Sequence, residues 1–267
     1  MIMLEVNRIY NMDCLEGMRQ IPDGSVSLVC TDLPYGTTAN KWDSVIPIDK
    51  LFDEWRRVLT DTGTVLLFGS EPFSTKLRMA ALDLYKYDWI WHKPYTTGFQ
   101  HAKNMPLKDY EIISVFSKGV MNHKHLSGDR RMTYNPQGVI KVNKVKYASP
   151  KKLGTTITKH ESQIGEYKVT EENYPRMVLN GYGRDNDSWH PTQKPVALVS
   201  YLVNTYTDSG GQDLVLDCCM GSGTAAVACI KTKRDFIGFE LNKDYYEKAC
   251  KRIEQAKLDV KTDLFGY

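Results

Sequence analysis

Thr31-Asp32-Leu33-Pro34-Tyr35-Gly36 closes an apolar run, Val26-Ser27-Leu28-Val29-Cys30. The length and β-branched content of that run are typical of a buried strand. Pro34 and Gly36 break the strand and predict a tight, exposed loop directly after it. The sequence therefore places an acid, Asp32, at the carboxyl end of a buried strand.

Asp32 and its neighbours suit the activation of an amino group on a nucleobase. The lone pair of such an amine is delocalised into the ring, and two hydrogen-bond acceptors aimed at its N–H groups would free it. Asp32 offers a carboxylate, and Leu33 offers a carbonyl held in a defined direction by the following proline. Tyr35 offers a flat face for a base. These six residues also leave open that Asp32 only caps a turn and Tyr35 packs on the core.

Strands alternate with helices along most of the chain. We predict further strands at residues 8–10, 64–68, 89–91, 110–116, 214–217 and 236–240. Helices are predicted before Pro22 and at residues 47–59, 72–82, 195–206, 224–230 and 242–256, with residues 61–63 forming the turn after the second helix. This alternation indicates an α/β fold with a mostly parallel, doubly wound sheet covered on both faces.

A glycine turn follows the strand at residues 214–217. Asp217-Cys218-Cys219-Met220-Gly221-Ser222-Gly223 leads into a helix that opens at Thr224. Glycines let a backbone approach a ligand closely, and the amino end of a helix favours an anionic group. No Gly-Lys-Ser/Thr follows, which excludes a phosphate loop, and the full dinucleotide spacing is missing. The pattern accepts an S-adenosylmethionine site, and Glu240, at the end of the next strand, is placed to bind ribose hydroxyls.

The composition is that of an ordinary intracellular protein. Of 267 residues, 42% are hydrophobic and 25% are charged, which excludes wholesale disorder and a fibrous class. No run approaches 18 apolar residues, and the first residues lack the pattern of a signal peptide, so neither membrane insertion nor export is expected. The six cysteines form no Cys-x-x-Cys pair, which favours reduced thiols, and no metal site is predicted.

A basic block interrupts the alternating pattern. Between Lys118 and His160 the chain carries ten Lys or Arg and a single acid, Asp129, although the whole chain has a net charge of only +3. Tyr, Asn, Gln and hydroxyl side chains are interleaved with these cations, and such a mixture is typical of a surface that binds a polyanion.

The chain resembles S-adenosylmethionine-dependent DNA amino-methyltransferases of the permuted, β-type arrangement over nearly its full length. Residues 32–35 resemble the catalytic Asp-Pro-Pro-Tyr signature, with Leu33 in place of the first proline. Residues 104–111 resemble a late motif of the catalytic half, and His190-Pro191-Thr192-Gln193-Lys194-Pro195 matches another family motif. Cys218-Cys219 departs from the family's usual Pro-Phe after Asp217.

The resemblance implies three segments, a cofactor and a set of site residues. A catalytic half at 1–117 precedes a target recognition insertion at 118–189, and a cofactor-binding half follows at 190–267. The implied catalytic residues are Asp32, Leu33, Pro34 and Tyr35. The residues implied to bind S-adenosylmethionine are Asp13, Cys14, Asp32, His190, Lys194, Asp217, Gly221, Ser222, Gly223, Thr224 and Glu240.

An aspartate at position 32, where amino-cytosine enzymes commonly carry serine, favours the 6-amino group of adenine as the methyl acceptor. We therefore expect a Rossmann-like DNA adenine methyltransferase that flips its target base out of double-stranded DNA, in the cytoplasm of a bacterium or a phage-infected host. Two alternatives stay open: an enzyme that acts on cytosine or RNA, and a non-catalytic DNA-binding protein. A homodimer is compatible with the sequence, which gives neither the recognised DNA site nor a restriction-enzyme partner.

Overall fold

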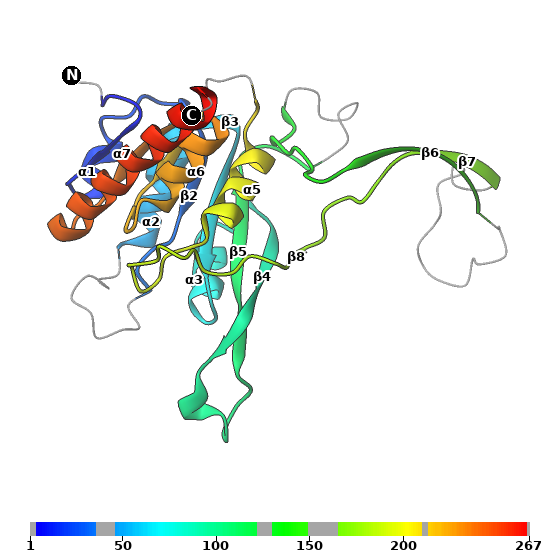
Figure 1. Cartoon of the computed structure of the whole chain (residues 1–267), viewed down its shortest axis with the longest axis horizontal. Coiled ribbons are helices and arrows are strands. Elements are labelled where there is room, and N and C mark those ends of the chain that lie inside the picture. Colours follow the sequence, from blue (N-terminus) through cyan, green and yellow to red (C-terminus); the bar gives the residue numbers. More distant parts are fainter. Residues whose placement is uncertain (1–3, 36–45, 122–129, 149–164, 210–212, 266–267) are drawn as a thin grey trace. The chain divides into compact units, whose positions relative to one another are not determined.

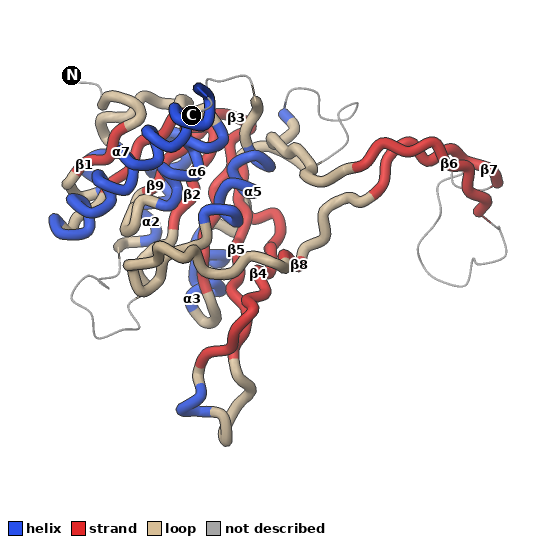
Figure 2. The backbone as a smooth tube through the Cα atoms, in the orientation of Figure 1, coloured by secondary structure: helices blue, strands red, loops and turns tan. Residues whose placement is uncertain are grey.

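The computed structural model describes residues 4–35, 46–121, 130–148, 165–209 and 213–265 (Figures 1 and 2). The chain divides into two compact units. Unit 1 comprises residues 1–135 and 177–267, and unit 2 comprises residues 136–176. Gly36, the last residue of the stretch that contains Asp32, lies outside the described residues.

An eight-stranded sheet forms the centre of unit 1, in the order β1-β10-β9-β2-β3-β5-β4-β8. Its strands are β1 (Arg8–Tyr10), β2 (Val26–Thr31), β3 (Leu59–Gly69), β4 (Tyr85–Thr97), β5 (Lys108–Ser117), β8 (Val178–Leu179), β9 (Leu214–Asp217) and β10 (Asp235–Phe239). All neighbouring pairs are parallel except β3 with β5 and β4 with β5. The predicted mostly parallel sheet is therefore confirmed.

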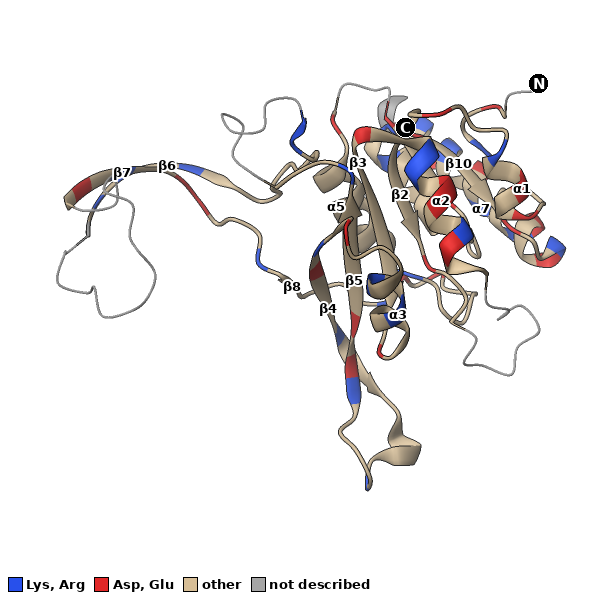
Figure 3. Cartoon of the chain, turned by 180° about the vertical axis from the view of Figure 1, so that it is seen from behind, with Lys and Arg blue, Asp and Glu red and all other residues tan. Residues whose placement is uncertain are grey.

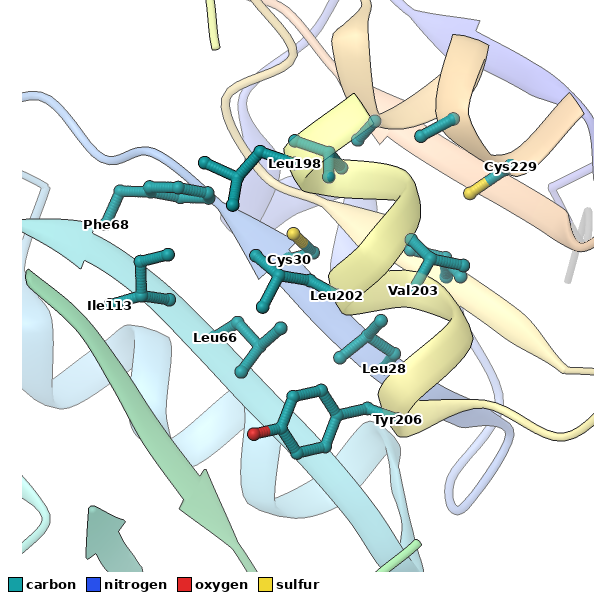
Figure 4. Close-up of a cluster of buried hydrophobic side chains, with 14 of the residues drawn as sticks. Leu28, Cys30, Leu66, Phe68, Ile113, Leu198, Leu202, Val203, Tyr206 and Cys229 are labelled. Atoms are coloured by element: carbon teal, nitrogen blue, oxygen red, sulfur yellow. The ribbon is translucent and has the colours of Figure 1, made fainter. Parts of the chain in front are cut away.

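Helices cover both faces of this sheet. Leu28 and Cys30 of β2 face a core built with α5 (Val196–Tyr206), α6 (Thr224–Thr232) and α7 (Lys243–Phe265), as Figure 4 shows for part of it. Val29, between them, faces the opposite core with α1 (Cys14–Met18), α2 (Ile48–Val58) and α3 (Phe73–Ala80). This alternation is the two-residue period of a strand that is buried on both faces. A slip of one residue would move every side chain to the opposite face, so the register of β2 is fixed and Asp32 follows it at the carboxyl edge of the sheet.

Two local predictions differ from the structure. Residues 61–63 were expected to be a turn, but they belong to β3, whose pairing with β2 shifts register between Val26 and Leu28. Residues 61–63 form the irregular part of β3 at this register shift. The strand therefore begins directly after the preceding helix, with no turn between them. The last helix, α7, runs to Phe265 instead of ending near Ala256. No Gly or Pro occurs in residues 257–265, so the sequence carries no signal that ends the helix at Ala256.

Unit 2 contains a two-stranded antiparallel sheet of β6 (Ile140–Ala148) and β7 (Gly165–Glu172). Lys144 of β6 pairs with Glu172 of β7 at 2.6 Å. The acids of β7 follow the basic block in sequence, so they offset part of its charge where the two strands pair. Residues 122–129 and 149–164 of the predicted insertion lie outside the described residues.

Candidate active site

A cavity of about 550 Å³ opens at the carboxyl ends of β2, β9 and β10. In an open α/β sheet this edge is where ligands bind. The cavity is lined by all of the predicted site residues except Gly223, namely Asp13, Cys14, Asp32, Leu33, Pro34, Tyr35, His190, Lys194, Asp217, Gly221, Ser222, Thr224 and Glu240. Residues more than 200 positions apart in the sequence therefore share one site.

Asp32 is held from two sides. The ammonium of Lys194 donates a hydrogen bond to its Oδ2 atom at 2.5 Å, and the hydroxyl of Tyr35 donates to its Oδ1 atom at 2.9 Å. The ring of Tyr35 packs against Phe73, with ring centroids 4.8 Å apart. Burial raises the pKa of Asp32, and the two donors oppose that rise. The carboxylate is thus ordered without a metal ion, while the side chain keeps 22% of its surface exposed towards the cavity.

Lys194 also lies 3.4 Å from Oε2 of Glu111, which comes from β5, and Glu111 in turn pairs with Lys93 of β4. These four side chains form a chain of alternating charge, Lys93-Glu111-Lys194-Asp32, which we call the charge chain. Burial alone would lower the pKa of Lys194, but Asp32 and Glu111 raise it above its usual value. Burial disfavours the charged form of Glu111, and its two lysine partners reverse this and lower its pKa. The ammonium of Lys194 is therefore permanently charged and has two acceptors within reach.

The glycine turn is tied to Glu240 by backbone hydrogen bonds. The N–H of Gly221 donates to Oε2 of Glu240 at 2.8 Å, and the N–H of Asn242 donates to Oε1 at 2.8 Å. Gly221 has φ +50°, in the left-handed region, and a Cβ there would lie 3.6 Å from Nε2 of His190. A carboxylate oxygen can accept more than one hydrogen bond, so these contacts do not by themselves prevent Glu240 from binding a ligand.

Gly223 differs from the other predicted site residues. It precedes α6 with φ +78°, and a Cβ there would lie 3.4 Å from the Cβ of Ala249 in α7. Glycine is required here by backbone conformation and by the approach of α7, and the residue does not line the cavity. The prediction that Gly223 contacts the cofactor therefore has no support from its position.

Two further residues are already engaged in structural contacts. Oδ1 of Asp13 accepts hydrogen bonds from the N–H groups of Leu15 and Glu16, so Asp13 caps α1 as well as lining the cavity. Cys218 is buried, and its sulfur accepts a hydrogen bond from the indole N–H of Trp55 at 3.4 Å. The side chain that replaces the family's proline therefore packs in the core.

Asp217 and His190 have strongly shifted pKa values. Burial raises the pKa of Asp217 to about 7, against the hydrogen bond that it accepts from the N–H of Cys219 at 3.0 Å. Burial and the nearby Lys194 lower the pKa of His190 to about 4, so its ring is neutral at neutral pH. The described residues contain no group of three or more His, Cys, Asp or Glu side chains placed to hold a metal ion.

A model of the DNA methylase family matches residues 26–251. The chain belongs to the DNA methylase family. The type II methyltransferase M1.MboII of Moraxella bovis is 28% identical to it, over 96% of this chain and 100% of that protein. The DNA adenine methyltransferase YhdJ of Escherichia coli (strain K12) is also 28% identical, over 94% of this chain and 84% of that protein.

Solved structures share the fold of this DNA methylase. The M1.HpyAVI–SAM complex superimposes with a TM-score of 0.59 at 20% identity, covering 92% of this chain and 98% of the other. The PvuII DNA methyltransferase, which is cytosine-N4-specific, superimposes with a TM-score of 0.64 at 15% identity, covering 99% and 95%. At these identities the similarity shows the fold only. The identity of the target base must be inferred from the residues of the site.

Three residues of this DNA methylase's cavity were given no role from sequence. Glu111 lies in the late catalytic-half motif, but only the antiparallel pairing of β5 with β3 brings it to Lys194. Thr192 and Gln193 lie within the motif that was already quoted, between His190 and Lys194. The side-chain amide of Gln193 is buried and has no hydrogen-bond partner among the described residues. A buried side-chain amide without hydrogen-bond partners costs folding free energy, and a ligand in the cavity could supply those partners.

Proposed function

We propose that this DNA methylase transfers a methyl group from S-adenosylmethionine to the 6-amino group of adenine in double-stranded DNA. The observation that carries the proposal is that Asp32 shares one cavity with the glycine turn and with Glu240. An acceptor for the target amine and a surface suited to the cofactor therefore meet at the same edge of the sheet. The role of each residue below is part of this proposal.

The residues around the cavity fit S-adenosylmethionine, which supplies an electrophilic methyl group when bound. Asp217 and Glu240 are acids at the ends of adjacent strands β9 and β10, and they suit the cationic amino-acid part and the ribose hydroxyls of the cofactor. The amino end of α6, with Thr224 as its first residue, suits the carboxylate. The side-chain amide of Gln193, which has no hydrogen-bond partner among the described residues, is a further group to which a ligand could hydrogen-bond.

Asp32 and the carbonyl of Leu33 act on the target amine. Each would accept a hydrogen bond from one N–H of the flipped base, which draws the amine nitrogen out of conjugation and frees its lone pair. The nitrogen would gain the methyl group as the bond from that group to the cofactor's sulfur breaks. It would then lose one proton, for which the hydrogen-bonded Asp32 carboxylate is the acceptor at hand. Tyr35 stacks on the base and donates to the Oδ1 atom of Asp32. Since both acceptors are fixed before the base arrives, little reorganisation is needed at the moment of reaction.

Lys194 and Glu111 keep Asp32 ready for this role. A buried carboxylate without a partner would take up a proton and lose its second acceptor lone pair. Lys194 keeps Asp32 ionised, and Glu111 offers the same ammonium a second acceptor 3.4 Å away. Lys194 therefore remains paired when the target amine takes over one of the Asp32 lone pairs.

Adenine is favoured over cytosine as the target. Asp32 stands where amino-cytosine enzymes commonly carry serine, and a curated relative over most of the chain is named a DNA adenine methyltransferase. We further propose that residues 118–189 recognise the target sequence and that the enzyme acts in the bacterial cytoplasm, where its DNA lies. None of the described helices is long and apolar enough to cross a bilayer.

Nucleoside analysis tests this function directly. DNA from a host that expresses the chain is digested to nucleosides and analysed by mass spectrometry, and we expect N6-methyldeoxyadenosine. Asp32→Ala should strongly reduce the signal, while Asp53→Ala, which removes an exposed acid on α2, should leave it unchanged. N4-methyldeoxycytidine as the product would reassign the base, and no methylated nucleoside in any DNA would refute the proposal. Sequencing of the methylated positions then gives the recognition site.

A further inference from the structure

A hairpin formed by β4 and β5 extends past the edge of the sheet where the cavity opens (Figure 1). The last residue of β3, Gly69, pairs with Ile112 of β5, whereas β4 pairs with β5 as far as Thr97 with Lys108, across a register shift between His92 and Thr97. At about 3.3 Å per strand residue, this pair lies roughly 13 Å beyond the end of β3. The hairpin end, residues 98–107, projects further still, on the same side as Asp32.

The hairpin end presents two large apolar side chains to solvent. Phe99 is 71% exposed and Met105 is 59% exposed, and all residues from Thr96 to Pro106 are exposed. Such side chains are normally buried, and the hairpin end has no core of its own to explain them. Two large apolar side chains exposed within one ten-residue hairpin end offer a surface for contact with a partner.

The charge of the hairpin end complements an anion. His101 and Lys103 lie at the end and Lys108 lies beside it, whereas no acid occurs from Tyr95 to Lys108. Figure 3 shows both charges along the stem of the hairpin but only basic colour at its end. Gln100 and Asn104 add amide groups that can bind base edges.

Charged side chains connect the stem of the hairpin to the rest of unit 1. Lys93 of β4 pairs with Glu111 of β5 and lies 4.9 Å from the ring centroid of Trp91. The guanidinium of Arg184 lies 5.3 Å from the ring centroid of Tyr95. The same Glu111 reaches Lys194 in the cavity, so the charge chain connects the stem to the catalytic edge.

We infer that the hairpin end, residues 98–107, enters a groove of the DNA duplex beside the target base and inserts Phe99 or Met105 against the base stack. This inference rests on the proposed function. A major groove is about 12 Å wide and admits a two-stranded β-ribbon, and apolar side chains wedged between bases offset the stacking that is lost when a base is flipped. His101 and Lys103 contact the flanking phosphates. The hairpin is thus a DNA contact separate from the basic block.

The test compares Phe99→Ala/Met105→Ala with Met79→Ala, which removes a 70% exposed methionine from α3. We expect the double variant to lose roughly tenfold to hundredfold in DNA affinity by fluorescence anisotropy, the effect of removing a stacked side chain. Fluorescence of 2-aminopurine at the target position should fall in parallel, because flipping is no longer supported. Met79→Ala should behave as the wild type, Phe99→Trp should retain affinity, and cofactor affinity should be unchanged in all four proteins.

A second readout separates the phosphate contacts from the apolar ones. Lys103→Gln should reduce the slope of log affinity against log salt by about one unit, because one fewer counterion is released. Wild-type DNA affinity and flipping in the double variant would overturn the inference. A change in sedimentation from oligomer to monomer in that variant, with unchanged DNA affinity, would instead assign the patch to self-association. If the wild-type protein binds DNA but methylates none, the proposed function is refuted. The inference about the hairpin is still tested in that case, because anisotropy measures DNA binding without methylation.

Discussion

The ammonium of Lys194 lies 2.5 Å from the carboxylate of Asp32, although the two residues are 162 positions apart. Asp32 ends a strand of the amino-terminal half, and Lys194 comes just before α5, after residues 136–176 of unit 2 have intervened. Burying a single charge is costly, and a matched pair lowers that cost. The ion pair therefore joins the two halves of the methylase domain at the reaction centre.

Removing the ammonium should make activity sensitive to acid. In Lys194→Met, burial acts on Asp32 without its main opposing charge, so the pKa of Asp32 rises further. In the proposed mechanism the ionised carboxylate accepts a hydrogen bond from the target amine, so the acidic limb of kcat/KM should move to higher pH. Loss of a charged hydrogen bond, about 1.5–3 kcal/mol, also predicts roughly tenfold to hundredfold lower kcat/KM at neutral pH. Single-turnover methylation measured across pH checks both effects.

Lys194→Arg serves as the control for this experiment, because it keeps the positive charge and should hold the acidic limb closer to that of the wild type. Thermal unfolding and cofactor affinity must be recorded for both variants, to separate a local change from loss of folding. An acidic limb at the same pH in Lys194→Met and the wild type would mean that Lys194 does not control Asp32.

Glu111→Gln should move the acidic limb in the opposite direction. The negative charge of Glu111 raises the pKa of Asp32, and it competes for the ammonium of Lys194. The amide removes that charge while keeping the shape of the side chain, so Asp32 should ionise at lower pH than in the wild type. The pH profile of single-turnover methylation measures this, with Glu247→Gln, an exposed substitution on α7, as the matched control. A shift to higher pH would contradict the arrangement of the charge chain.

Much of this site could be predicted because its parts are local in sequence. Asp32 and Glu240 each follow a buried apolar run, and parallel strands bring such ends to one edge of a sheet. Glu111 was given no role, because its place depends on β5 running antiparallel to β3, and an apolar strand pattern does not reveal its direction. For the same reason the paired charges of Lys93 and Lys194 were not foreseen.

Two other differences follow from tertiary context. Gly221 and Gly223 look equivalent in the sequence, but one faces His190 and the other faces α7. Residues 130–135 and 177–189 lie within the insertion as predicted from sequence, yet they belong to unit 1. Met132 is a single apolar residue in polar surroundings, and Leu179 ends the short apolar run Met177-Val178-Leu179. Both pack into the main core, but neither segment is long enough to give a periodic signal.

Asp217 should make cofactor affinity depend on pH. Burial raises the pKa of this carboxyl to about 7, so it is partly protonated at neutral pH. S-adenosylmethionine carries positive charge and favours the ionised form, and affinity should therefore rise as pH increases through about 7 and become constant above it. Binding near neutral pH should release protons, which titration calorimetry detects in two buffers of different ionisation enthalpy. Asp217→Asn cannot ionise, and if its affinity kept the wild-type pH dependence, another group would be responsible.

Tyr35 should act through both its ring and its hydroxyl. We propose that the ring stacks on the target base, and the hydroxyl donates to Asp32 at 2.9 Å, which lowers the pKa of that carboxyl. Tyr35→Ala should lose stacking worth about 1–3 kcal/mol, or roughly tenfold to hundredfold in single-turnover rate. Tyr35→Phe keeps the ring, so it should retain most activity at alkaline pH and lose activity mainly on the acidic limb. Equal damage by both substitutions at alkaline pH would show that the ring has no separate role.

Asp32→Ala completes this comparison, since it removes the acceptor itself. We expect the methylation rate to fall by about two to three orders of magnitude, the size found when one preorganised polar partner is lost. DNA affinity should be retained, because we propose that the phosphate contacts come from the hairpin end and the basic block. The same assay with Asp32→Asn keeps a carbonyl acceptor but removes the charge that Lys194 needs, so its rate should lie between those of Asp32→Ala and the wild type. A wild-type rate for Asp32→Ala would remove this carboxylate from the mechanism.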